Sequence, residues 1–182
     1  MSTMPTMVRG ATITEDGLYR YALTRSWDPD PETTFELHRP IVWIGLNPST
    51  ANGEVDDPTI RRCVNFTRDM GHCHLTMVNL MAYRATAPRD LVAAELLGFD
   101  IVGPLNDEVI IAAAEGASLV VAAWGAHRFA KQRSEIVLSL IDPIGGTPLA
   151  GTPVTCLGRT RAGHPRHPLY VKGNTPLEVL RG

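Results

Sequence analysis

Four short apolar runs, each followed by a polar turn, constrain the fold of this chain more than any other feature. The runs cover residues 41–46, 74–80, 118–125 and 153–158. The first, IVWIGL, is apolar without alternation, as expected of a strand that is covered on both faces. Helical patterns fill the connections, and strands that alternate with helices predict right-handed crossovers and a mainly parallel sheet. We therefore expect an α/β fold, a three-layer αβα sandwich around a four-stranded parallel sheet.

The connections show where the helices begin and end. Asp56 or Asp57 precedes Pro58 as a candidate N-cap, and Gly71 ends the helix that follows. Further helices are predicted over residues 91–97, 105–115 and 126–141.

The rest of the chain predicts an edge strand or hairpin arm over 17–25 and loops over 27–40 and 142–153. We expect residues 1–182 to form a single domain, to which the N-terminal segment 1–40 belongs.

Composition favours a globular protein without a membrane segment. Hydrophobic residues make up 44% of the 182 residues, enough for a sizeable core. No apolar run approaches the roughly 20 residues that span a bilayer, and the N-terminus lacks the apolar stretch of a signal peptide. We expect a cytoplasmic monomer that does not associate with membranes. The net charge of −2 neither supports nor excludes a DNA partner.

The cysteines and their histidine neighbours raise the question of a metal site. Three cysteines, Cys63, Cys73 and Cys156, lack tight spacing and predict buried free thiols instead of disulfides. Residues 71–74, GHCH, contain metal-ligand side chains, but no CxxC or HxxxH pair supplies a chelating spacing. We therefore predict a turn between a helix and a strand at this point, and no metal.

Polar residues follow all four predicted strands, and in a parallel sheet the loops after the strands meet at one rim. These residues are 47–49, 83–86, 124–125 and 164–170. The glycine-rich motifs of nucleotide-binding loops and the GxSxG motif of serine hydrolases are absent from the sequence. An Asn at a strand end, with nearby Asp and His side chains, suits the positioning of a water molecule and hydrogen bonding to developing negative charge. Cleavage of an N-glycosidic bond requires both.

Several of these segments resemble known families. The stretch GLNP at 45–48 is similar to the first motif of the uracil/thymine DNA glycosylase superfamily. The segments VNL and RAT, VVAAWGA and the late His-Pro loop resemble later parts of that superfamily in the same order. Over nearly the whole chain, the pattern RYALTRSW, GLNPSTA, DDPTIRRC, VNLMAYRAT, AAWG and GHPRHPLYV resembles the phage and bacterial proteins that carry domain of unknown function 1643.

The glycosylase resemblance implies a uracil-DNA glycosylase-like fold and a role for each matching residue. Asn47 would hold the attacking water, and His167 would donate to a carbonyl oxygen of the departing base. Asn79 would contact the base edge or a phosphate, and Arg84 a phosphate. The remaining expected substrate-binding residues are Gly45, Leu46, Pro48, Ser49, Tyr83, Trp124, His164, Arg166 and Tyr170. The sequence departs from the glycosylase pattern at Ser49, where the motif has Gly, and at the late Pro-Arg-His-Pro segment.

We expect an enzyme that hydrolyses the N-glycosidic bond of a modified or deaminated pyrimidine in DNA or a nucleotide, without a cofactor. Two alternatives remain open. One is a binding module for nucleic acid or a modified base that lacks catalysis, and the other is a phage-type enzyme that modifies a DNA base. Plainer roles also remain open for single residues: Asn47 as the cap of its own turn, Asp56 and Asp57 as helix caps, and the patch of Arg159, Arg161, Arg166 and Lys172 as solvated surface.

Overall fold

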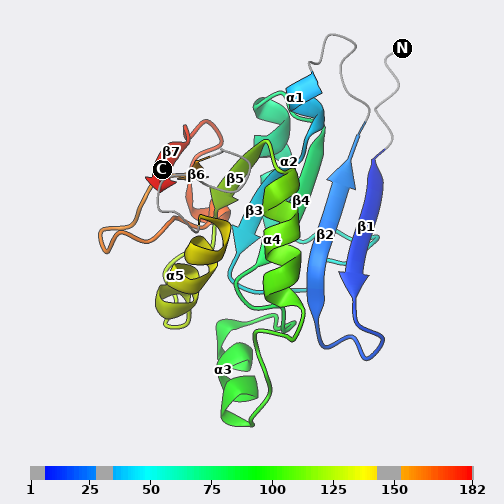
Figure 1. The fold of residues 1–182 in the computed structure, drawn as a ribbon, viewed down its shortest axis with the longest axis vertical. Helices are drawn as coiled ribbons and strands as arrows, with labels where there is room; N and C mark the ends of the chain where they lie inside the picture. Colours follow the sequence, from blue (N-terminus) through cyan, green and yellow to red (C-terminus); the bar gives the residue numbers. More distant parts are fainter. Residues whose placement is uncertain (1–6, 28–34, 143–152, 182) are drawn as a thin grey trace.

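A computed structural model describes residues 7–27, 35–142 and 153–181, which form an α/β fold (Figure 1). Its strands are β1 (Val8–Ile13), β2 (Arg20–Ser26), β3 (Ile41–Gly45), β4 (His74–Asn79), β5 (Leu119–Ala122), β6 (Val154–Cys156) and β7 (Glu178–Arg181). Its helices are α1 (Phe35–His38), α2 (Pro58–Asp69), α3 (Pro88–Leu96), α4 (Asn106–Gly116), α5 (Ala130–Ile141) and the short 3-10 helix η2 (Pro168–Tyr170).

The sheet has seven strands in the order β1-β2-β4-β3-β5-β6-β7, so the prediction of a four-stranded parallel sheet is wrong. The predicted strands correspond to β3, β4, β5 and β6, which pair in parallel. The predicted sheet did not include the antiparallel strands outside these four, which are β1 and β2 beside β4 and β7 beside β6. For residues 17–25, the alternative of a hairpin arm is correct, because β2 pairs with β1, and the alternative of an edge strand is wrong, because β2 lies between β1 and β4. Pairing between distant strands is not encoded in local apolar runs, so the sequence did not predict that these strands extend the parallel sheet.

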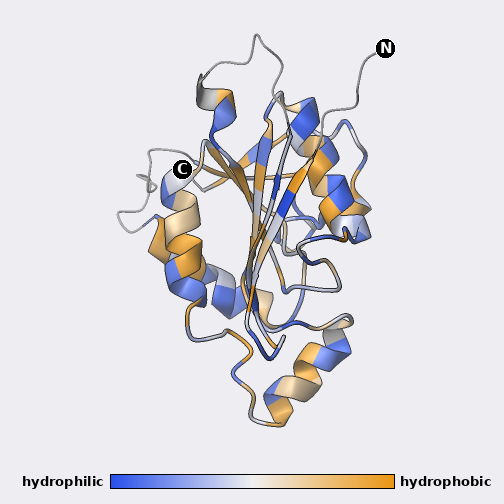
Figure 2. Cartoon of the chain, turned by 90° about the vertical axis from the view of Figure 1, so that its right-hand side faces the viewer, coloured by the Kyte–Doolittle hydropathy of each residue, from blue (hydrophilic) through white to orange (hydrophobic). Residues whose placement is uncertain are grey.

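Helices cover both faces of the sheet (Figure 2). The core has two parts, one beneath α2 and one beneath α4 and α5. All residues of β3 are buried, and they alternate between the two parts: Ile41 and Trp43 pack towards α2, whereas Val42 and Ile44 pack towards α4 and α5. This double coverage explains why the strand is apolar at every position.

The helix α2 begins where its capping residues predict. Asp57 is the N-cap, and its Oδ1 accepts a hydrogen bond from the backbone N–H of Ile60 at 2.8 Å. Pro58 occupies the first turn, where its missing N–H costs nothing. Gly71, with φ of +80°, follows the helix end in the left-handed region that glycine favours. The predicted N-cap is therefore confirmed and assigned to Asp57.

The other connecting segments mostly have the predicted type of secondary structure, although their boundaries differ from the prediction. The predicted helices at 91–97, 105–115 and 126–141 correspond to α3, α4 and α5. The predicted loop at 27–40 contains α1, whereas most of the loop predicted at 142–153 lies outside the described residues. The three cysteines are buried free thiols, as predicted. Within the part of the chain that the structure describes, no helix has the length and apolar character needed to cross a membrane.

Candidate functional site

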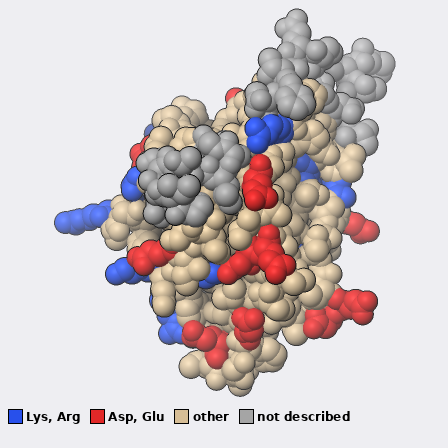
Figure 3. Space-filling view, viewed as in Figure 1, with Lys and Arg blue, Asp and Glu red and all other residues tan. Residues whose placement is uncertain are grey.

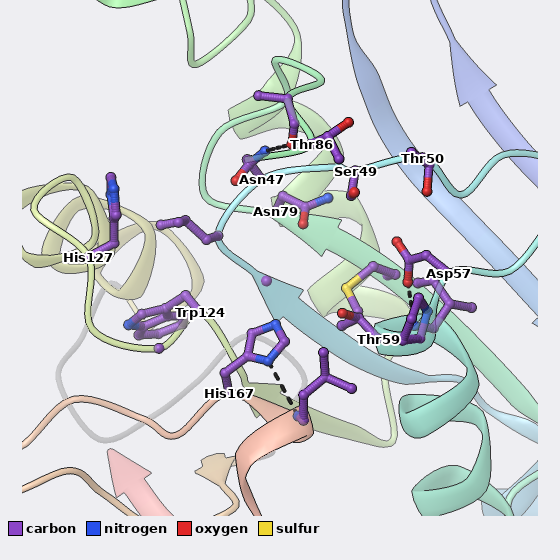
Figure 4. Close-up of a pocket in the computed structure, with 18 of the residues that line it drawn as sticks. Asn47, Ser49, Thr50, Asp57, Thr59, Asn79, Thr86, Trp124, His127 and His167 are labelled. Atoms are coloured by element: carbon purple, nitrogen blue, oxygen red, sulfur yellow. Dashed lines mark hydrogen bonds between the residues drawn. The ribbon is translucent and has the colours of Figure 1, made fainter. Parts of the chain in front are cut away.

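A pocket of about 580 Å³ opens at the carboxyl ends of β3, β4 and β5 (Figure 4). The strand β3 lies between β4 and β5, so the chain crosses to one side of β3 and then to the other. Ligands of open α/β sheets bind in the crevice that this change of direction creates. Of the residues expected in the site, the pocket brings together Gly45, Leu46, Asn47, Ser49, Asn79, Trp124, His167 and Tyr170.

The remaining expected site residues, Pro48, Tyr83, Arg84, His164 and Arg166, do not line this pocket. The ring of Tyr83 packs edge-on against Tyr19 at 6.0 Å between centroids and also contacts Phe99. Arg84 Nη1 donates to the carbonyl of Gly17 at 3.1 Å. Both side chains therefore support the β1–β2 hairpin and its neighbours in this structure.

Several residues of the basic segment 159–167 form hydrogen bonds that stabilise their own loop. Arg166 Nε donates to the carbonyl of Arg159 at 3.0 Å, and Arg159 itself pairs with Glu178 at 3.3 Å. The backbone N–H of His164 donates to Thr160 Oγ1. Of the two late histidines, His167 is therefore the one that lines the pocket.

The Asn47 amide ties two loops together. Its Nδ2 donates to the carbonyl oxygens of Pro48 at 2.9 Å and Ala85 at 2.8 Å. The turn-capping role weighed for Asn47 is therefore present. Because these bonds fix the amide nitrogen, they also fix the orientation of Oδ1. This oxygen remains an acceptor, and Asn47 lines the pocket.

Asn79 presents an unpaired amide on the pocket wall. Only 2% of the residue is exposed, and its Nδ2 finds no hydrogen-bond partner among the described residues. A Cβ at Gly45 would lie 2.7 Å from Asn79 Oδ1, so glycine at that position leaves room for the amide. A buried donor without a partner costs about 1–3 kcal/mol. A ligand that offers an acceptor here would remove that cost.

The imidazole of His167 points into the pocket from the start of η2, beside Trp124 (Figure 4). Its Nδ1 accepts the backbone N–H of Leu169 at 3.3 Å, so the ring proton is on Nε2 in the neutral form. Burial lowers the pKa of His167, and the Asp57 carboxylate opposes this shift only in part. The ring is therefore a neutral Nε2–H donor near neutral pH. Gly125, with φ of +71°, packs against it, since a Cβ there would lie 3.4 Å from His167 Cβ.

We expect NMR of the imidazole nitrogens to show His167 as the Nε2–H tautomer, with a pKa below its ordinary value of about 6.5. The unfolded chain then takes up this proton at a higher pH than the folded protein does. The contribution of His167 to the free energy of unfolding is therefore complete above about pH 6.5 and declines as the pH falls below it. A His167→Asn variant assigns the signal, and a proton on Nδ1 or a raised pKa would contradict the assignment.

Sequence reasoning gave two pocket residues other roles. Asp57 is predicted as a helix cap, and it also lines the pocket. It directly precedes Pro58, the first residue of α2. Arg20 is predicted only as part of an edge strand or hairpin arm, yet it lines the pocket from the start of β2. The presence of both residues at one pocket depends on the pairing of β2 with β4, which the sequence did not reveal. Thr86, from the predicted rim loop 83–86, lines the pocket as well, and lining residues not singled out are Thr59, Met77 and His127.

The possible metal ligands lie elsewhere. His74 begins β4, at the opposite end from Asn79, and the turn predicted before it is present. The ligating atoms of His38, Cys73 and His74 all lie within 4.8 Å of one another. These side chains could share one ion, and the prediction that the protein has no metal remains a prediction.

Comparison with known proteins identifies one family. The model of a family described as protein of unknown function (DUF1643) matches residues 20–169. No curated protein matches the chain, and neither does any solved structure.

Proposed function

The chain belongs to the DUF1643 family, and we propose that it hydrolyses the N-glycosidic bond of a nucleobase held in the pocket at the ends of β3, β4 and β5. A modified or deaminated pyrimidine, in DNA or in a nucleotide, is the proposed base. The relation to the uracil-DNA glycosylase fold is part of this proposal and rests on the GLNP, Trp-Gly and His-Pro segments.

The observation that carries the proposal is the fixed tautomer of His167. When the C1′–N bond breaks, its electron pair leaves with the base, and negative charge spreads onto the ring oxygens. A donor that is already oriented towards that charge stabilises the transition state more than it stabilises the substrate. The neutral Nε2–H of His167 is such a donor, because Leu169 N–H occupies the other ring nitrogen.

The attack at C1′ requires a water molecule and a general base that activates it. Asn47 Oδ1 accepts a hydrogen bond from this water, and the Asp57 carboxylate takes its proton as the oxygen bonds to C1′. Asp57 keeps its Oδ1 on Ile60 N–H, so the other carboxylate oxygen receives the proton. The products are the free base, which regains a proton, and a sugar with a hydroxyl at C1′.

A mass-spectrometric assay of released base tests the proposal. Wild type and a His167→Asn variant are incubated with oligonucleotides and nucleotides that carry uracil, mismatched thymine or modified pyrimidines. Asn can still accept the Leu169 N–H but cannot reach the position of Nε2. We expect base release by wild type and about 10²–10³-fold slower release by the variant, as for loss of an oxyanion donor. Equal rates for both proteins would contradict the role of His167.

A non-catalytic binding module is a second candidate, because both donors of Asn47 serve the loops and thus give that residue a sufficient structural role. Under this alternative, wild type binds a base but releases none. A base-modifying enzyme would instead leave an oligonucleotide of increased mass.

A further inference from the structure

Arg20 is a buried cation on the wall of the pocket. It is the first residue of β2, and only 2% of it is exposed. Its backbone N–H donates to the carbonyl of Ala82 at 2.9 Å, which fixes the residue beside the end of β4. Among the residues that line the pocket, all of them described, Arg20 and Asp57 are the two that carry a full charge.

The guanidinium of Arg20 lacks the partners that buried arginines normally have. Its Nη1 donates to the carbonyl of Ala51 at 2.7 Å, whereas its Nε finds no acceptor among the described residues. The Asp57 carboxylate raises the pKa of Arg20 and so opposes the effect of burial, but no ion pair joins the two side chains within the described residues.

Arg25, on the same strand, shows the contrast. It is also fully buried, yet it bonds the Asp56 carboxylate at 2.7 Å and the carbonyls of Thr24 and Asn52. The strand thus contains one buried arginine whose donors are satisfied by the protein and one whose donors are not.

Burial lowers the pKa of Arg20 to about 10, so the side chain remains a cation at neutral pH. A buried charge without a close counter-ion is strongly unfavourable, whereas an anion that enters the pocket would supply that counter-ion. Guanidinium groups match the oxygens of phosphate by their planar arrangement of donors.

Thr50 and Thr59 line the same pocket as Arg20. Ala51, whose carbonyl holds the guanidinium, directly follows Thr50, and Thr50 lines the same pocket. Thr50 and Thr59 lie on the side of the pocket where α2 begins (Figure 4). The space of about 580 Å³ suits a small molecule of nucleotide size.

We propose that Arg20 binds the terminal phosphate of a nucleoside monophosphate, so that the substrate is a free nucleotide and not a DNA strand. This inference rests on the proposed function. Arg20 lines the pocket and only 2% of it is exposed, so a phosphate that reaches its guanidinium must enter the pocket. A terminal phosphate can do so alone, whereas an internal phosphodiester brings the nucleotides on both sides of it.

One face of the molecule offers no basic surface for a DNA strand. On the face shown in Figure 3, which is the side of α4 and α5, acidic side chains lie over the middle and lower part, and the basic side chains form no continuous patch. Arg166, one of the expected substrate-binding residues, bonds the carbonyl of Arg159, and Arg159 pairs with Glu178. Double-stranded DNA binding draws its affinity chiefly from such basic contacts.

Calorimetric titration tests the proposal without requiring catalysis. Wild type is titrated with inorganic phosphate, with deoxynucleoside 5′-monophosphates of the common bases and uracil, with the matching nucleosides, and with oligonucleotides. We expect at least one monophosphate to bind about tenfold or more tightly than its nucleoside. In Arg20→Met this ratio should fall to about one, whereas Arg61→Met, which removes an equal charge outside the pocket lining, should keep it.

Other results of these titrations and assays would contradict either the role of Arg20 or the proposed function. Equal affinity of wild type for nucleosides and monophosphates, or no binding of either, overturns the inference, and so does tighter binding of an oligonucleotide. The wild-type comparison decides the matter even if Arg20→Met does not fold, and Arg20→Lys then serves as the second variant, with a reduced ratio expected. Phosphate-dependent binding without base release contradicts only the proposed function. Base release at equal kcat/KM from nucleosides and monophosphates contradicts only the role of Arg20.

Discussion

Asp57→Asn is expected to slow base release by about 10²–10⁴-fold, the usual contribution of a general base. Asp57 lines the pocket, and in the proposed reaction its carboxylate takes the proton of the attacking water, which an amide cannot do. The same substitution should leave the free energy of unfolding almost unchanged. Asn is as good an N-cap as Asp, so the bond from Ile60 N–H is retained. Base-release rates and thermal unfolding measured on one preparation check both parts.

Asp57→Ala is the matched control for the capping role. It removes the acceptor of Ile60 N–H and should cost about 1 kcal/mol of stability as well as activity. If Asp57→Asn were as active as wild type, Asp57 would be a helix cap alone, and the proton would have to go elsewhere.

Asp56→Asn is expected to have the opposite effect, with stability lost and activity kept. Asp56 bonds Arg25, whose side chain has no exposed surface, at 2.7 Å, and it lies 3.6 Å from Arg9. Removing one partner of a buried pair leaves the other charge uncompensated and costs about 3 kcal/mol. For a chain of this size that loss corresponds to a fall in Tm of roughly 6–12 °C.

Activity assayed well below the melting temperature separates the two adjacent aspartates. The Asp56→Asn variant should then release base at close to the wild-type rate, since Asp56 does not line the pocket. A large loss of activity in a folded Asp56→Asn protein would contradict this division, as would an unchanged Tm.

The sequence predicted the parts of the fold that depend on local signals. The apolar run of β3, the Asp57 N-cap and the glycine after α2 are each set by neighbouring residues, and each is found where expected. The sequence also predicts a hairpin arm at 17–25, but neither its pairing with β4 nor the strand β7, because both depend on partners distant in sequence.

The same distinction applies to the site. Asn47 follows a predicted strand, Asn79 lies near the end of one, and His167 belongs to the late loop, so the rule that parallel strands meet at one rim placed them together. Tyr83 and Arg84 also follow a strand, but the hairpin that contains Tyr19 and Gly17 engages them. Arg20 could not be placed in the pocket without knowing that β2 pairs with β4.

In the proposed reaction a water molecule replaces the base at C1′, and the fate of the water oxygen can be followed. The protein is incubated with candidate nucleotides and oligonucleotides in water labelled with heavy oxygen, and mass spectrometry follows the base and the sugar separately. We expect an unlabelled free base and a sugar product that carries the heavy oxygen. Intact substrate in every case, or a product that keeps its base and gains mass, would contradict the proposed reaction.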